Sequence, residues 1–147
     1  MKQLFVIDTN CLIRYFHVLF HQTVLLSAEA TSILDAAFSG SPEILISVPS
    51  IVFVEIYAKW LNNEEFAKAF YYEVFFKITE SPNFEIRPID DEVMEHLVQL
   101  DGVMIGHDLH DKIILASAMV LECPLISTDT HIRNYVATSD VIPRVIH

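Results

Sequence analysis

HDLHDKIILASAMVLECPLISTDTHI, residues 107–132, contains a helix pattern followed by a strand pattern. One acidic residue stands at the start of the helix pattern, and another stands at the end of the strand pattern. Asp111 stands before an apolar run that predicts a helix over Lys112–Leu121. Asp129 follows a second, shorter run that predicts a strand over Pro124–Thr128. In an α/β chain, a helix that leads into a parallel strand begins at the edge of the sheet where that strand ends. We therefore expect Asp111 and Asp129 to lie at the same edge of one sheet.

The rest of the chain repeats this alternation of strands and helices. Short, nearly continuous apolar runs predict four further strands, at Leu4–Ile7, Ile44–Val48, Phe84–Ile89 and Ile142–Ile146. Helical patterns lie between them, at Cys11–Leu19, Ala28–Phe38, Ser50–Leu61, Glu64–Ile78 and Asp91–Leu100. Strands that alternate with helices predict a parallel sheet covered on both faces, and right-handed crossovers favour a doubly wound strand order.

Length and composition set the class of protein. The 147 residues fit a single domain, 1–147, and 52% hydrophobic residues can fill a sizeable core. We find no apolar run long enough to span a bilayer and no signal peptide in MKQLFVIDTN, and the two cysteines make no disulfide framework. These features predict a soluble cytoplasmic protein. A net charge of −11 argues against nonspecific nucleic-acid binding through cations, yet it is compatible with a metal-dependent nuclease and with a basic partner.

Two further carboxylates stand at the same predicted edge. Asp8 directly follows the first strand, in LFVIDTN, where it is either a metal ligand or the N-cap of the next helix. Glu55, in IVFVEIYA, carries the single charge between Ile44 and Ala58, and we favour a functional role over a solvent-facing position on its helix.

The acidic residues within residues 107–132 can likewise be metal ligands or residues that stabilise the start of a helix. Asp108 and Asp111 are three residues apart on one helical face, where the helix dipole stabilises acidic side chains in the first turn. Asp111 is the better candidate ligand, and Asp108 is a candidate for a supporting or weaker second-metal position. Asp129 is either a ligand or the cap of a short helix. Asn10 and Thr128 are candidates for orienting a ligand carboxylate or a water molecule.

Together, Asp8, Glu55, Asp111 and Asp129 predict a metal site. Crowded carboxylates repel one another, and a divalent cation relieves that repulsion. An oxygen-only set of ligands favours Mg²⁺ or Mn²⁺, whereas the seven histidines show no metal-ligand spacing. Such an ion lowers the pKa of a bound water molecule and neutralises charge on a phosphate, so phosphodiester hydrolysis is the predicted chemistry.

The sequence also resembles a known family. VIDTNCLIRYF, VEIYA and the opening stretch are similar to the PIN domain, above all to the VapC-type ribonuclease toxins of toxin–antitoxin modules. The resemblance covers essentially the whole chain. It implies a three-layer α/β/α fold with a five-stranded parallel sheet of order 3-2-1-4-5. It also implies an Mg²⁺- or Mn²⁺-dependent endoribonuclease, a homodimer, a cognate antitoxin protein, and an acidic metal site at Asp8, Glu55, Asp111 and Asp129.

Three other classes share a strand-end aspartate. A phosphotransferase of the haloacid-dehalogenase type needs a second aspartate two residues after the first, where this chain has Asn10. A receiver domain needs a lysine at the end of a late strand, where this chain has Ser127, Thr128 and Asp129. The strongest alternative is a catalytically silent PIN-like module that binds or assembles with a partner.

Overall fold

A five-stranded parallel sheet forms the centre of the molecule. The computed structural model describes residues 2–60, 62–101, 108–138 and 144–147. The strands are β1 (Gln3–Ile7), β2 (Ile44–Pro49), β3 (Phe84–Arg87), β4 (Leu125–Ile126) and β5 (Val145–Ile146). Their order is β3-β2-β1-β4-β5, so the predicted order 3-2-1-4-5 is confirmed.

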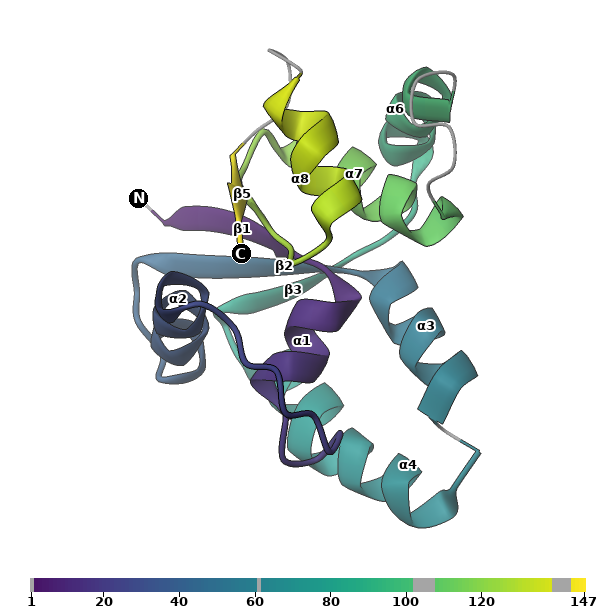
Figure 1. The fold of residues 1–147 in the computed structure, drawn as a ribbon. Coiled ribbons are helices and arrows are strands. Elements are labelled where there is room, and N and C mark those ends of the chain that lie inside the picture. Colours follow the sequence, from purple (N-terminus) through teal and green to yellow (C-terminus); the bar gives the residue numbers. More distant parts are fainter. Residues whose placement is uncertain (1, 61, 102–107, 139–143) are drawn as a thin grey trace.

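Helices cover both faces of this sheet (Figure 1). α1, α2 and α4 lie on one side of the sheet, and α6, α7 and α8 lie on the other. The helical segments are α1 (Thr9–Tyr15), α2 (Ala28–Phe38), α3 (Ser50–Trp60), α4 (Glu64–Phe70), the π-helical turn η1 (Tyr71–Phe75), α5 (Phe76–Glu80), α6 (Asp91–Asp101), α7 (Leu109–Leu121) and α8 (Thr130–Ala137). The predicted three-layer α/β/α architecture is therefore confirmed.

The central strands are apolar because both of their faces are buried. Phe5, Val6 and Ile7 of β1 are all buried, as are both residues of β4. Such strands give continuous rather than alternating apolar runs, which is why their positions can be predicted. The largest fully buried side chains come from strands and helices alike: Phe70, Ile7, Leu12, Leu34, Ile46, Ile56, Ile78, Leu100, Ile114, Leu115 and Leu125.

Several element boundaries differ from those predicted. α1 ends at Tyr15 rather than at Leu19, although Phe20 beyond it is buried against Trp60 and Phe66. The apolar periodicity thus continues into a turn that packs on the core, and the pattern alone overestimates the helix. The helix predicted over Glu64–Ile78 is observed as α4, η1 and α5 in succession.

Other differences lie close to the candidate site. α7 begins at Leu109, one turn before the predicted start, and β4 contains two residues instead of five. α8, which we anticipated only as the short helix that Asp129 would cap, is observed at Thr130–Ala137. The strand predicted over Ile142–Ile146 falls partly outside the described residues, of which Val145 and Ile146 form β5. None of the helices in the described ranges is long and apolar enough to cross a membrane.

Candidate functional site

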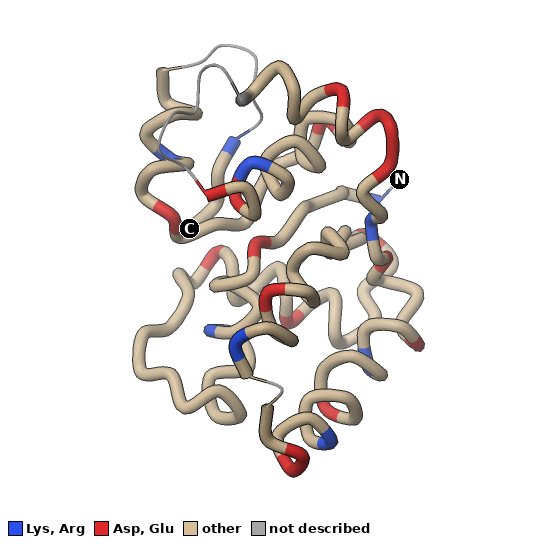
Figure 2. The backbone as a smooth tube through the Cα atoms, turned by 90° about the vertical axis from the view of Figure 1, so that its right-hand side faces the viewer, with Lys and Arg blue, Asp and Glu red and all other residues tan. Residues whose placement is uncertain are grey.

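The predicted carboxylates converge at the edge of the sheet where the strands end. Asp8, Glu55, Asp111 and Asp129 line one hollow of about 120 Å³, together with Thr9, Asn10, Lys59 and Asp108. Figure 2 faces this edge, and acidic positions occur near the centre of the view, between the helices on the two sides of the sheet. Four separate segments bring them together: Asp8 follows β1, Glu55 lies in the second turn of α3, Asp111 lies in the first turn of α7, and Asp129 stands between β4 and α8.

Asp8 is held by backbone and side-chain donors. Its side chain is 4% exposed, and its Oδ1 accepts a hydrogen bond from the backbone N–H of Cys11 at 2.8 Å. Its Oδ2 accepts a hydrogen bond from the hydroxyl of Ser127. Asp8 is therefore the N-cap of α1 and a wall of the hollow at the same time.

Ser127 connects Asp8 to the segment that bears Asp129. Its Oγ donates to Asp8 and accepts a hydrogen bond from the backbone N–H of Asp129 at 3.1 Å. The Oδ1 of Asp129 in turn caps α8 by accepting the N–H of Ile132 at 3.0 Å. One buried hydroxyl thus links the carboxylate that follows β1 to the segment that follows β4, two strands that are already paired through their backbones.

Glu55 is held from two sides. The hydroxyl of Thr9 donates to its Oε1 at 2.8 Å, and the ammonium of Lys59 lies 3.6 Å from its Oε2. The side chain of Glu55 is 11% exposed, so the predicted functional position is mostly buried rather than solvent-facing. Such partners replace part of the hydration that a carboxylate loses when it is withdrawn from water.

The electrostatics of the hollow show that these carboxylates interact. The pKa of Asp111 is raised to about 6, chiefly by burial and in addition by the charges of Asp129, Asp8 and Glu55, with a smaller effect from Asp108. Burial also raises the pKa of Asp8, against the lowering effect of its hydrogen bonds to Ser127 and Cys11. The site therefore holds more negative charge than the metal-free protein accommodates easily.

The supporting residues are only partly those predicted. Asn10 and Asp108 line the hollow, and Asp108 is the N-cap residue of α7 without a side-chain capping bond. Thr128 is not among the described residues that line it, and its backbone lies against the thiol of Cys11. Ser127 was missed, although it stands two residues before Asp129 in LISTDT.

The ligand chemistry fits a hard divalent cation. Carboxylate oxygens dominate the walls of the hollow, and such oxygens are the preferred ligands of Mg²⁺ and Mn²⁺. Within the described ranges, no three of the aspartate, glutamate, histidine or cysteine side chains are close enough together to hold one ion at once. Binding would therefore require small movements of these side chains into the hollow.

Comparison with solved structures shows that this chain has a known fold. A chain in the structure of VapBC2 from Rickettsia felis, bound to a DNA fragment from their promoter, aligns with a TM-score of 0.66 and 12% identity over 99% of this chain and 100% of that one. FitAcB from Neisseria gonorrhoeae aligns with a TM-score of 0.67 and 14% identity, over 97% of this chain and 96% of that one.

A toxin–antitoxin complex from Klebsiella pneumoniae is more similar in sequence, at 26% identity over 88% of each chain with a TM-score of 0.55. No protein-family model matches the sequence, and no curated protein matches it. The chain has the PIN-domain fold, in the form found in VapC-type toxin–antitoxin proteins.

Replacing Ser127 with alanine tests the role of its hydroxyl. Ser127→Ala leaves the buried Asp8 carboxylate without one of its hydrogen-bond donors, which should lower the free energy of unfolding by about 1–3 kcal/mol. Ser47→Ala is the matched control, because Ser47 is equally buried but its hydroxyl has no hydrogen-bond partner among the described residues. Urea denaturation should show that Ser47→Ala is neutral or stabilising. Equal losses in both variants would show that the Ser127 hydrogen bonds contribute nothing specific.

The raised pKa of Asp111 predicts a dependence of stability on pH. Its folded-state pKa of about 6 lies above the ordinary 3.8, so the folded protein retains a proton that the unfolded chain has lost. The stability of the metal-free protein should therefore fall as pH rises from about 4 to about 6. Asp111→Asn removes this contribution, so the variant should gain about 1 kcal/mol relative to wild type between these pH values in EDTA, an amount reduced by solvent screening of a half-buried group. A gain that does not change with pH would contradict the assignment.

Proposed function

We propose that this protein is an Mg²⁺- or Mn²⁺-dependent endoribonuclease that hydrolyses RNA phosphodiester bonds, and that it is the toxin of a toxin–antitoxin module. The observation that carries the proposal is the hollow at the carboxyl edge of a PIN-type sheet, lined by Asp8, Glu55, Asp111 and Asp129. The likeness to chains from solved toxin–antitoxin structures supports the biological role.

In the proposed reaction, Asp8, Asp111 and Asp129 hold the metal ion. A bound divalent ion lowers the pKa of a coordinated water molecule and neutralises charge that develops on the phosphate. Ser127 keeps Asp8 and the Asp129 segment in register through its two hydrogen bonds. Thr9 holds Oε1 of Glu55. Oε2, which lies 3.6 Å from the ammonium of Lys59, would complete the site or orient the attacking water.

The proposed partners are single-stranded RNA as substrate and a cognate antitoxin protein. The chain carries 20 acidic and 9 basic residues, so charge complementarity favours an antitoxin segment that bears Arg or Lys. Such a side chain could reach the carboxylates and take the place of the metal. Both roles belong to the cytoplasm, where the free thiols of Cys11 and Cys123 would stay reduced.

A homodimer is the proposed assembly, and the aromatic segment Phe70–Phe76 supplies its candidate interface. Tyr71, Tyr72 and Phe76 are exposed on the η1–α5 segment, and Val54 and Tyr57 are exposed on α3. Phe70, by contrast, packs inward beside Phe20 and Phe53. The segment thus belongs partly to the core, and its exposed rings have the apolar and aromatic character typical of an interface centre.

A second candidate function is a catalytically silent PIN-like module that binds or assembles with a partner. It is favoured by the wide spacing of the carboxylates, since no three candidate ligands among the described residues meet at one point. The presence of all four predicted carboxylates in one hollow supports the enzyme.

Substitution of the carboxylates tests the nuclease. Asp8→Asn and Asp129→Asn should abolish Mn²⁺-dependent RNA cleavage, since each removes a negatively charged ligand. The fold should persist, because asparagine also caps helices. Asp108→Asn should reduce cleavage less than Asp111→Asn. Asp91→Asn, at an exposed position outside the hollow, is the control and should cleave like wild type. Cleavage by pure Asp8→Asn protein at the wild-type rate would contradict the site.

Expression in bacteria tests the toxin role separately. The wild-type chain, produced alone, should slow growth and degrade RNA, whereas Asp8→Asn at an equal level should do neither. If both chains affect growth and RNA integrity identically, the binding-module interpretation replaces the toxin, or the nuclease acts outside toxin–antitoxin control.

A further inference from the structure

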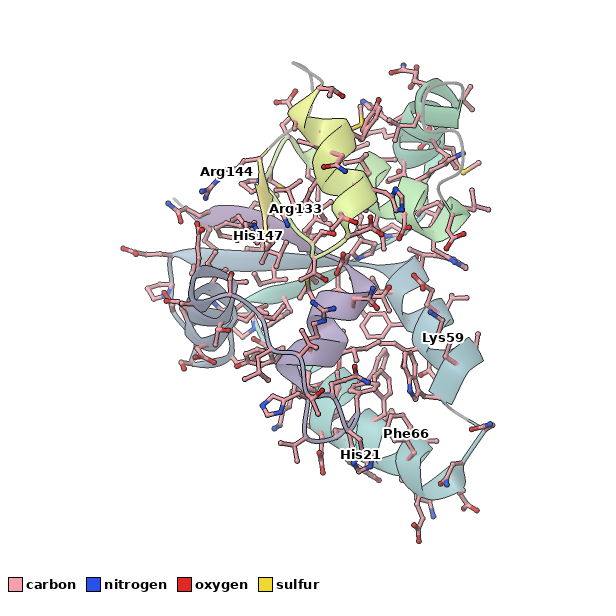
Figure 3. All side chains as sticks on the ribbon, in the orientation of Figure 1. His21, Lys59, Phe66, Arg133, Arg144 and His147 are labelled. Atoms are coloured by element: carbon pink, nitrogen blue, oxygen red, sulfur yellow. The ribbon has the colours of Figure 1, made fainter. Side chains whose placement is uncertain are left out.

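A basic side chain stands in the wall of the carboxylate hollow. Lys59 lies on α3, one turn after Glu55, and is labelled on that helix in Figure 3. Among the described residues that line the hollow it carries the one positive charge. Its Nζ lies 3.6 Å from Oε2 of Glu55.

The two ends of this ion pair differ in exposure. The side chain of Glu55 is 11% exposed, whereas that of Lys59 is 57% exposed. Glu55 is also anchored by Thr9 through its other oxygen, Oε1. Glu55 is therefore the fixed partner, and Lys59, on a flexible four-carbon stem, is the partner that can leave.

We propose that Lys59 is a positioning residue of the nuclease site, which occupies Glu55 while metal is absent and binds a phosphate oxygen of RNA once a divalent ion takes over Glu55. This inference rests on the proposed nuclease function. In the metal-free protein the ammonium is a tethered cation that offsets part of the repulsion among the carboxylates. In the loaded protein the metal supplies that charge, and the ammonium at the rim becomes available for an anion.

The surroundings favour RNA phosphate as that anion. The chain has a net charge of −11, so few cations are available to hold a polyanion near the hollow. Lys59 stands at the hollow beside Glu55, so a phosphodiester that approached the carboxylates would come close to its ammonium. Lysine suits this role because its ammonium acts as a point charge and does not require one fixed planar partner.

Replacing Lys59 should change the affinity for Mn²⁺ and the affinity for RNA in opposite directions. Lys59→Met keeps the length and the apolar stem but removes a cation that competes with the metal, so Mn²⁺ should bind about three- to tenfold more tightly. The same change removes a phosphate contact, so single-stranded RNA should bind about three- to tenfold more weakly in the presence of Mn²⁺. Lys59→Arg, which retains the charge, should restore most of the RNA affinity.

The chain offers a matched control on α4. Lys68 forms the same type of ion pair one turn from Glu64, at 3.2 Å, with both side chains highly exposed and outside the hollow. Lys68→Met therefore removes the same charge from the same kind of pair. It should leave both affinities within about twofold of wild type, which separates a local effect from the general effect of net charge.

The experiment combines two titrations of purified protein. Calorimetry measures Mn²⁺ binding to the EDTA-treated, dialysed protein without RNA, and fluorescence anisotropy measures binding of a labelled random-sequence single-stranded RNA in Mn²⁺. Tighter metal binding together with weaker RNA binding in Lys59→Met alone supports the proposal. If wild type binds Mn²⁺ but Lys59→Met matches Lys68→Met, or if both affinities move in the same direction, the role of Lys59 is refuted while the nuclease stands. If wild type binds no Mn²⁺, the nuclease proposal fails and the role of Lys59 fails with it.

Discussion

Mutual repulsion among carboxylates at one edge of the sheet is the constraint on which the rest of the site depends. Asp8 and Asp111 both have raised pKa values, and burial is the largest cause for each, with neighbouring negative charges adding to it. Burial in a low-dielectric interior strengthens every such interaction. The fold must therefore supply donors that hold these groups in place.

Helix capping supplies much of that support. Asp8 caps α1 and Asp129 caps α8, so each accepts a backbone N–H that would otherwise be unsatisfied. From the sequence alone, helix capping and metal binding are alternative roles for Asp8 and Asp129. In the structure, the two roles are compatible. A carboxylate can accept the capping bond with one lone pair and still present others to the hollow. The stability of α1 and α8 is thereby linked to the same side chains that form the candidate site.

The sequence predicts those features that depend on neighbouring residues or on a periodic pattern of apolar residues. The buried strands β1 and β2 give continuous apolar runs, and the carboxylates follow because parallel strands end at a common edge. The order of the strands came from resemblance to a family rather than from periodicity. The i,i+4 spacing of Glu55 and Lys59 is visible in the sequence, but the burial of one partner and the exposure of the other are tertiary properties.

Ser127 shows where prediction from sequence stops. Three consecutive polar residues, Ser127, Thr128 and Asp129, follow β4, and the pattern does not say which hydroxyl turns towards Asp8. Side chains alternate between the two faces of a strand, and β4 is only two residues long. An error of one residue in the predicted end of β4 would therefore point Thr128, instead of Ser127, towards Asp8. The end of α1 could not be predicted either. Phe20 lies in a turn beyond the helix, but it is buried and therefore gives the same apolar signal as a helical residue.

The central claim is that the four carboxylates of the hollow form a divalent metal site. A crystal of the protein grown with Mn²⁺, with diffraction recorded at a wavelength where manganese scatters anomalously, tests it most directly. The account predicts an anomalous peak in the hollow, with carboxylate oxygens of Asp8, Asp111 and Asp129 at coordination distance and the ammonium of Lys59 displaced from Glu55. A fully occupied peak elsewhere, or no peak in the hollow at saturating Mn²⁺, would contradict it.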